Sequence, residues 1–228
     1  MQAQAFDYPE SFFEPRVHRV RRPGPDAEEL ADAAAVFRGA ERPLVIAGGG
    51  VHYSLAADDL ASFVERHQLP VAETVAGKSA LRSDHPNAVG PIGVTGGTAA
   101  NALAADADVV LAVGTRLQDF TTGSWSVFRN DRKRLIALNT ARFDATKHLA
   151  LPLVADARRG LEELTSALGD HRAPDVWISR ARDEYRTWNA YLDTQASAPT
   201  ETGLPSYAAV VRAVNEAGDD GDYALTAA

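Results

Sequence analysis

The segment Asp108–Gly114, DVVLAVG, is the feature that most restricts how this chain can fold. Its apolar residues are continuous rather than alternating, so a strand formed here must be covered on both faces. Two similar runs follow, RLIALN at Arg134–Asn139 and LPLVAD at 151–156. Strands of this kind, alternating with helices, predict an α/β fold with a doubly wound parallel sheet and helices on both faces.

Other segments complete this alternating pattern. Asp26 and Glu29 have the spacing of a capping box, which predicts a helix ending near Gly39. After the glycines of residues 48–50, we expect Ser54 to cap a second helix. Residues 76–97 are rich in glycine and predict a long loop. The remaining expected elements are strands at Leu44–Ala47 and Pro70–Thr74 and helices at Thr98–Ala105, Ala157–Leu168 and Ser206–Ala217.

Changes in the pattern divide the 228 residues into four regions. Residues 1–25 predict an extended arm, because their prolines and aromatic residues have neither helical nor strand periodicity. Residues 26–170 form the predicted α/β domain, and 171–203 a long amphipathic helix with a linker. Residues 204–228 carry a helix and a strand, DYALTAA, which we interpret as the truncated start of a further domain.

Two apolar surfaces are expected to need a partner. The arm carries Phe6, Tyr8, Phe12 and Phe13 on a segment that cannot bury them itself, so we expect these rings to pack on a neighbour. The long helix has a stripe at helical spacing that must also be covered. Its members are Trp177, Ala181, Tyr185, Trp188 and Leu192.

Composition excludes several classes of function. The formal net charge is -8 and the isoelectric point about 5.2, which disfavours binding to nucleic acid or to an anionic membrane. No apolar run reaches the roughly 18 residues that a membrane helix needs. The absence of cysteine excludes disulfides and thiolate sites, and it fits a reducing cytoplasm.

The glycine turn Gly48, Gly49 and Gly50 is the first candidate binding loop. It matches the first and third glycines of a dinucleotide fingerprint, but Tyr53 occupies the position of the sixth. We also expect no acidic residue at the end of the second strand to hold a ribose. NAD binding is therefore disfavoured, and a structural turn is the preferred interpretation. The amides of Gly49 and Gly50 could alternatively receive an anion.

A second candidate loop follows the strand at Asp108–Gly114. It contains Gly114, Thr115, Arg116 and Asp119, at the carboxyl end of a strand, where α/β folds bind ligands. Arg116 could pair with a phosphate or carboxylate, or it could brace the loop by pairing with Asp119. Both readings stay open from the sequence.

No complete catalytic or metal site is predicted. The six histidines are scattered, without a pair at metal-ligand spacing, and no serine lies in a nucleophile elbow. Lys78 lacks the remainder of a phosphate loop, so we interpret it as a loop-bracing or solvated lysine. The GDDGD segment at Gly218–Asp222 is interpreted as a solvated turn.

Taken together, four segments resemble a known family. They are RPLVIAGGG, GKSALRSDHPNAVGPIGVTGG, DVVLAVGTRLQDFTTGSW and RLIALNTARFDATKH. In this order they are similar to the Rossmann-like central domain of thiamine-diphosphate enzymes of the acetohydroxyacid-synthase type, over about Asp26–Leu168. The arm Phe6–Leu30 and the tail Gly203–Ala228 are similar to the trihydroxycyclohexanedione hydrolase family of myo-inositol catabolism.

The resemblance implies an enzyme that uses thiamine diphosphate and magnesium to open the ring of trihydroxycyclohexanedione with water. It implies that the activating glutamate and the magnesium motif lie in pyrimidine- and pyrophosphate-binding domains outside this sequence. This chain would then be a structural central domain, inactive alone, within a homo-oligomeric parent.

The resemblance also leaves an alternative function. Some relatives bind FAD or ADP on this domain, but Asn139, Thr140 and Ala141 stand where such relatives tend to carry acidic residues. A free-standing FAD, ADP or NAD module, or the central domain of another acetohydroxyacid-synthase-like enzyme, is therefore the less favoured reading.

Overall fold

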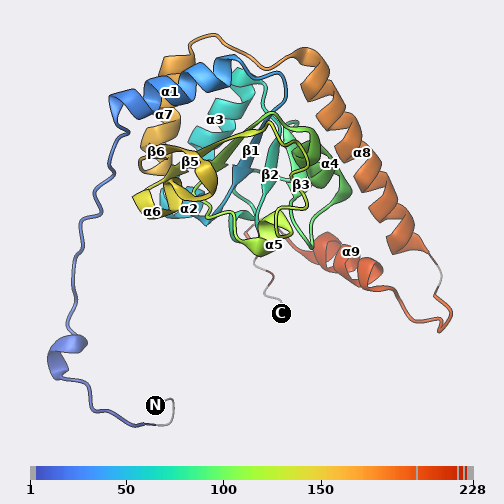
Figure 1. Ribbon diagram of the computed structural model, residues 1–228. Coiled ribbons are helices and arrows are strands. Elements are labelled where there is room, and N and C mark those ends of the chain that lie inside the picture. Colours follow the sequence, from blue (N-terminus) through green and yellow to red (C-terminus); the bar gives the residue numbers. More distant parts are fainter. Residues whose placement is uncertain (1–3, 199, 220, 223, 225–228) are drawn as a thin grey trace.

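The chain folds around a six-stranded sheet in which every pair of neighbouring strands is parallel. This computed structural model describes residues 4–198, 200–219, 221–222 and 224. The strand order is β3-β2-β1-β4-β5-β6, so the direction of winding reverses between β1 and β4 (Figure 1). The predicted doubly wound α/β fold is confirmed.

The elements have the following bounds. The strands are β1 (Pro43–Ala47), β2 (Val71–Glu73), β3 (Ala88–Pro91), β4 (Val109–Val113), β5 (Arg134–Asn139) and β6 (Leu151–Val154). The α-helices are α1 (Ala27–Arg38), α2 (Gly49–Tyr53), α3 (Ala57–His67), α4 (Thr98–Asp106), α5 (Asp119–Thr122), α6 (Arg142–Ala145), α7 (Ala157–Leu168), α8 (Asp175–Ser197) and α9 (Tyr207–Ala217). Three short 3₁₀ turns are η1 (Glu10–Phe12), η2 (Val75–Gly77) and η3 (Lys147–Leu149).

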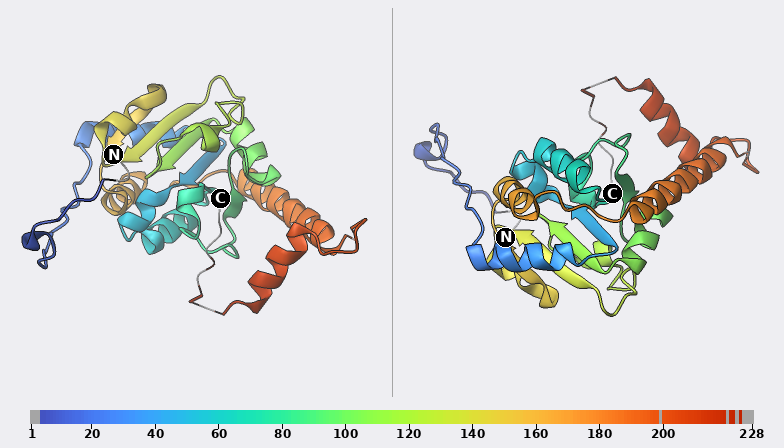
Figure 2. Two further views of the ribbon diagram at one scale, coloured as in Figure 1. Left: turned by 90° about the horizontal axis from the view of Figure 1, so that it is seen from below. Right: turned by 90° about the horizontal axis from the view of Figure 1, so that it is seen from above.

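The sheet has a separate hydrophobic core on each face. Along β1 the side chains alternate: Val45 packs with α1, α3 and α7, and Leu44 packs with α4 and α8. Figure 2 shows these two helical layers on opposite sides of the sheet. All five residues of β4 are buried, which is why its apolar run is unbroken.

One strand was not expected from the sequence. The predicted loop of residues 76–97 contains β3, the edge strand that pairs with β2. Its sequence, AVGP, holds only two fully buried residues and ends in glycine and proline, which are unusual in strands. The prediction of one continuous loop is therefore wrong over these four residues.

Two predicted capping roles are also wrong. Asp26 caps α1 as expected, but the Glu29 carboxylate turns to β6, where it accepts a hydrogen bond from Val154 N at 2.8 Å and pairs with Arg142. The N-cap residue of α3 is Ala56, which has no capping side chain, whereas the Ser54 hydroxyl donates to Asp156. In both places a tertiary partner outcompetes the local backbone for the side chain.

The long helix α8 packs on the sheet through its first half. Trp177 and Ala181 are buried, and Trp177 Nε1 donates to Pro43 O at 2.8 Å. Farther along the predicted stripe, Tyr185 lies against Gly90 and Trp188 against Gly97, while Leu192 is 39% exposed. No helix in the described part of the chain is both long and apolar enough to cross a bilayer.

Both ends of the chain keep apolar side chains exposed. In the arm, Phe6, Tyr8, Phe12 and Phe13 contact one another, yet each remains more than half exposed. That a neighbour covers them stays a prediction. Most of the expected C-terminal strand DYALTAA lies outside the described residues.

A buried histidine joins α3 to the segment that leads into α8. His67 is fully buried, and its Nδ1 lies 2.6 Å from the His171 carbonyl oxygen. Because that oxygen can only accept, Nδ1 carries the hydrogen, and Nε2 has no hydrogen-bond partner in the part of the chain that the structure describes. Burial lowers the pKa of His67 below its ordinary value, with nearby Arg66 and Arg172 acting in the same direction.

We predict that His67 makes the chain less stable in mild acid. The unfolded chain gains a proton near the ordinary histidine pKa of about 6.5, whereas the folded chain resists it. Stability is therefore complete above that pH and declines as the pH falls below it. Urea unfolding from pH 8 to pH 5 should show a shallower decline in His67→Gln than in the parent chain. His18→Gln, in the exposed arm, is the matched control and should leave the decline unchanged.

Candidate functional site

A cleft of about 400 Å³ opens at the carboxyl ends of β1 and β4. This is the point where the strand order reverses and where open α/β sheets bind ligands. The turn after β1, the loop after β4 and the residues that follow β2, β3 and β5 form its walls. The predicted residues that line it are Gly49, Gly50, Gly114, Thr115 and Arg116.

The glycines of this cleft allow the backbone of the turn after β1 to contact the backbone at the end of β4. Gly48 N donates to Val113 O at 2.8 Å, and Gly50 N donates to Gly114 O at 2.9 Å. A Cβ on Gly50 would lie 2.5 Å from the Gly114 Cα, and Gly114 itself has a φ of +60°. No side chain fits at this contact, so the glycines are required by packing.

This contact changes the predicted anion site. The Gly50 amide, expected to be available to an anion, is already bonded to Gly114, so of the two predicted donors Gly49 alone keeps that role. Gly48 is not part of the cleft lining. The helix that follows, α2, has only five residues, which limits its dipole.

The loop after β4 is not braced in the predicted way. Within the described residues no ion pair joins Arg116 to Asp119, so that reading is wrong. Arg116 is exposed in the cleft wall, whereas Asp119 begins α5 and lies outside the lining. Of the two charged residues predicted in this loop, Arg116 is therefore the one that lines the cleft.

An acidic residue does end the second strand, contrary to expectation. Glu73 is the last residue of β2 and is 6% exposed. Its Oε1 accepts from Leu81 N at 3.0 Å, and its Oε2 lies 3.8 Å from Lys78 Nζ. Glu73 therefore holds the loop after β2, with Lys78 as a brace, and its carboxylate does not face the cleft.

The arm forms part of the site, which the sequence did not suggest. Val20 and Arg21 line an adjoining hollow of about 310 Å³ that shares Gly50, Gly114 and Asn139 with the cleft. The first predicted region is thus in contact with the second at the candidate site.

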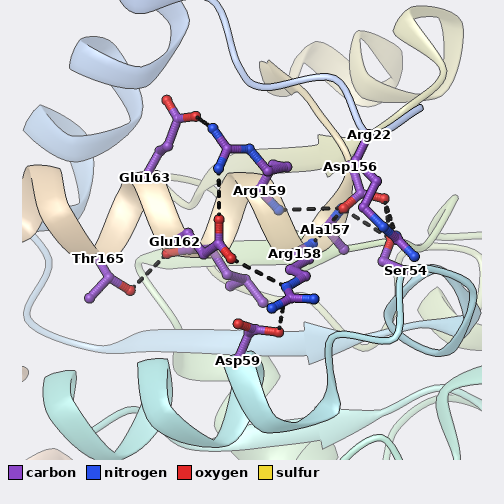
Figure 3. A network of polar contacts seen from close by, with 11 residues as sticks. Arg22, Ser54, Asp59, Asp156, Ala157, Arg158, Arg159, Glu162, Glu163 and Thr165 are labelled. Carbon is purple, nitrogen blue, oxygen red and sulfur yellow. Dashed lines mark hydrogen bonds and ion pairs between the residues drawn. The ribbon is translucent and has the colours of Figure 1, made fainter.

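Asp156, between β6 and α7, fixes the arm at this position (Figure 3). Its Oδ2 accepts hydrogen bonds at 2.8 Å from both Arg22 and the Ser54 hydroxyl. Its Oδ1 accepts from the amides of Arg158 and Arg159 in the first turn of α7, and its own amide donates to Pro23 O at 2.9 Å. Asp156 is 5% exposed, so this charge is compensated by the partners that it joins.

The described residues contain no group of three or more histidine, cysteine, aspartate or glutamate side chains that could hold a metal ion. The acidic segment Gly218–Asp222 is described apart from Asp220, and within it Asp219 N donates to the Asp222 carboxylate.

We predict that Asp156→Ala lowers the free energy of unfolding by about 3 kcal/mol, because it removes a helix cap and leaves Ser54 and Arg22 without their partner. Asp26→Ala is the matched control, since the Asp26 side chain also caps a helix but bonds to no other segment among the described residues. It should cost about 1 kcal/mol. Urea unfolding of both variants gives the comparison, and equal losses would contradict the role of Asp156 as a junction.

Comparison with known proteins shows clear similarity. The family pattern described as "Thiamine pyrophosphate enzyme, central domain" matches residues 30–164. A protein of Geobacillus thermodenitrificans is 44% identical over 198 residues, covering 86% of this chain and 30% of the relative. One of Clostridium perfringens is 45% identical over 168 residues, covering 74% and 26%, and one of Bacillus cereus is 42% identical over 190 residues, covering 82% and 30%.

All three relatives are named 3D-(3,5/4)-trihydroxycyclohexane-1,2-dione hydrolase. The chain spans less than a third of the length of each. The alignment of 198 residues is longer than the family pattern at residues 30–164, so the likeness extends into the segments that flank the central domain.

Proposed function

The chain belongs to the thiamine pyrophosphate enzymes, whose central domain it contains, and from this premise we propose that it serves a hydrolase that opens trihydroxycyclohexanedione in inositol catabolism. One observation supports the assignment of this substrate. The 44% identity to a relative of that name extends beyond the central domain into the segments that flank it. The cysteine-free composition suits work in the reducing cytoplasm.

We assign this chain an architectural part in the reaction. The cofactor of the family supplies an electron sink for breaking a C–C bond when it is bound. The described residues include no group of three or more metal-ligating side chains that could hold the magnesium ion that accompanies it. We propose that both are held by pyrimidine- and pyrophosphate-binding domains of the same polypeptide, in a homo-oligomer.

The exposed surfaces support attachment to further domains. Helix α9 has no buried residue, and its apolar side chains Tyr207, Val211 and Val214 are about half or more exposed. We infer that α9 belongs to a domain starting near residue 204, with 171–203 as the connecting helix and linker. The exposed rings of the arm would meet a domain on the other side, and Asp156 would set its direction of attachment.

A chimera tests this function. We predict that this chain, replacing the matching 198-residue segment of the Geobacillus thermodenitrificans relative, retains ring-opening activity within about tenfold. The isolated chain with thiamine diphosphate and magnesium should show no turnover. A folded chimera that binds the cofactor but leaves the dione intact would contradict the proposed substrate, and turnover by the isolated chain would contradict the architectural role.

We further propose that the cleft at Gly49, Thr115 and Arg116 binds FAD and ADP poorly. The Gly50 amide is already bonded, and the Glu73 carboxylate at the end of β2 is turned to the following loop. Asp144, the acid in the cleft lining, pairs with Lys147. Calorimetry with FAD, ADP and NAD should give dissociation constants above roughly 1 mM. Micromolar binding that is lost in Arg116→Gln would instead favour the nucleotide-binding alternative.

A further inference from the structure

Another cavity, of about 660 Å³, lies at the amino ends of the strands, opposite to the carboxyl ends where the cleft opens. It opens where β5 and β6 begin, since it is lined by Arg134, the first residue of β5, and Leu151, the first residue of β6. Leu135 and Pro152 add to its apolar lining. This volume is within the range of roughly 300–1,000 Å³ that is typical of small-molecule sites.

The backbone around this cavity is strained. Eight non-glycine residues in the described part of the chain have a positive φ, and half of them line or adjoin this one cavity. They are Ser124 at 51°, Trp125 at 69°, His148 at 60° and Leu149 at 57°. Packing of the Leu149 side chain does not offset the cost of its positive φ, because that side chain is fully exposed. Clustered strain of this kind is typical of functional sites.

The side chains around the cavity combine cations with an aromatic surface. Trp125 lies 4.5 Å from the His148 ring, centroid to centroid, and Lys133 Nζ lies 6.0 Å from the Trp125 centroid. Lys133 Nζ also donates to the Asn130 carbonyl at 3.3 Å, which holds it at the rim.

The second cation, Arg134, is available to a ligand. Within the described residues its guanidinium has neither an ion pair nor a hydrogen bond. The lining includes one acid, Asp131, which pairs with neither cation in that part of the chain. An unpaired arginine beside a lysine is suited to a phosphate or carboxylate.

We propose that this cavity binds a small aromatic anion, with the flat ring against Trp125 and His148 and the anionic group between Lys133 and Arg134. The strained backbone of residues 124–125 and 148–149 holds the two rings in place. Because the cavity lies at the amino ends of the strands, a ligand here leaves the cleft free. The proposal does not rest on the proposed hydrolase function.

Phenyl phosphate is the probe for this site. For a ligand of about eleven non-hydrogen atoms we expect a dissociation constant of roughly 0.1–1 mM by calorimetry on the 228-residue chain. Inorganic phosphate and benzyl alcohol, which each supply one half of the recognition, should bind at least about tenfold more weakly. Equal binding of phenyl phosphate and inorganic phosphate would overturn the aromatic part of the proposal.

Variants locate the binding. Lys133→Gln and Arg134→Gln should each weaken phenyl phosphate binding at least about fivefold. Arg132→Gln, in the same loop but outside the lining, is the matched control and should leave it unchanged, as should Arg116→Gln in the cleft. No saturable binding up to about 10 mM, or binding lost in Arg116→Gln alone, overturns the site.

The strain is tested at Leu149. Glycine adopts a positive φ without penalty, so Leu149→Gly should raise Tm by about 2–4 °C. The same variant should weaken phenyl phosphate binding, because the more flexible backbone at residue 149 no longer fixes the position of the His148 ring. Unchanged affinity in a variant with raised Tm would overturn the assigned role of the strained backbone.

Discussion

The contact between the turn after β1 and the end of β4 is the constraint on which the rest of this structure depends. Gly50 donates to Gly114 O, and neither position has room for a Cβ. The strand order reverses between β1 and β4, so right-handed crossovers carry the chain from these two strands to opposite faces of the sheet, and the cleft lies between the two connections. The same contact uses an amide that a phosphate would otherwise bind. A turn that looks like a nucleotide loop in sequence is thus largely a packing device in three dimensions.

Asp156 extends this constraint to the N-terminal arm. A nearly buried carboxylate is costly unless its oxygens are bonded, and here they meet an arginine of the arm, a serine after α2 and amides in the first turn of α7. The partners come from three separate parts of the chain, so the charge specifies how these parts meet. The arm consequently leaves the domain from a defined place, beside the candidate cleft.

The sequence predicted the parts of the fold that depend on continuous apolar patterns. β4, β5 and the helix α7 could be found because burial repeats along the chain, and the parallel sheet followed from them. It could not predict β3, whose four residues carry too little apolar pattern, or the partners of Glu29 and Ser54, which come from distant segments. The residues of the candidate site likewise fall into those that the sequence could identify and those that it could not. The glycines and Arg116 were identifiable by their position after strands, whereas the contributions of Val20 and Arg21 depend on the tertiary fold.

The contact of Glu29 with β6 has a consequence for how copies of this chain behave at high concentration. β6 is the outermost strand on its side, and a free strand edge is a template for pairing with another molecule. Glu29 occupies the outward amide of Val154, and Arg142 holds the glutamate there. Because this amide is already bonded, it is not available to the carbonyl of an incoming strand. Growth of the sheet from one copy to the next is thereby disfavoured on that side.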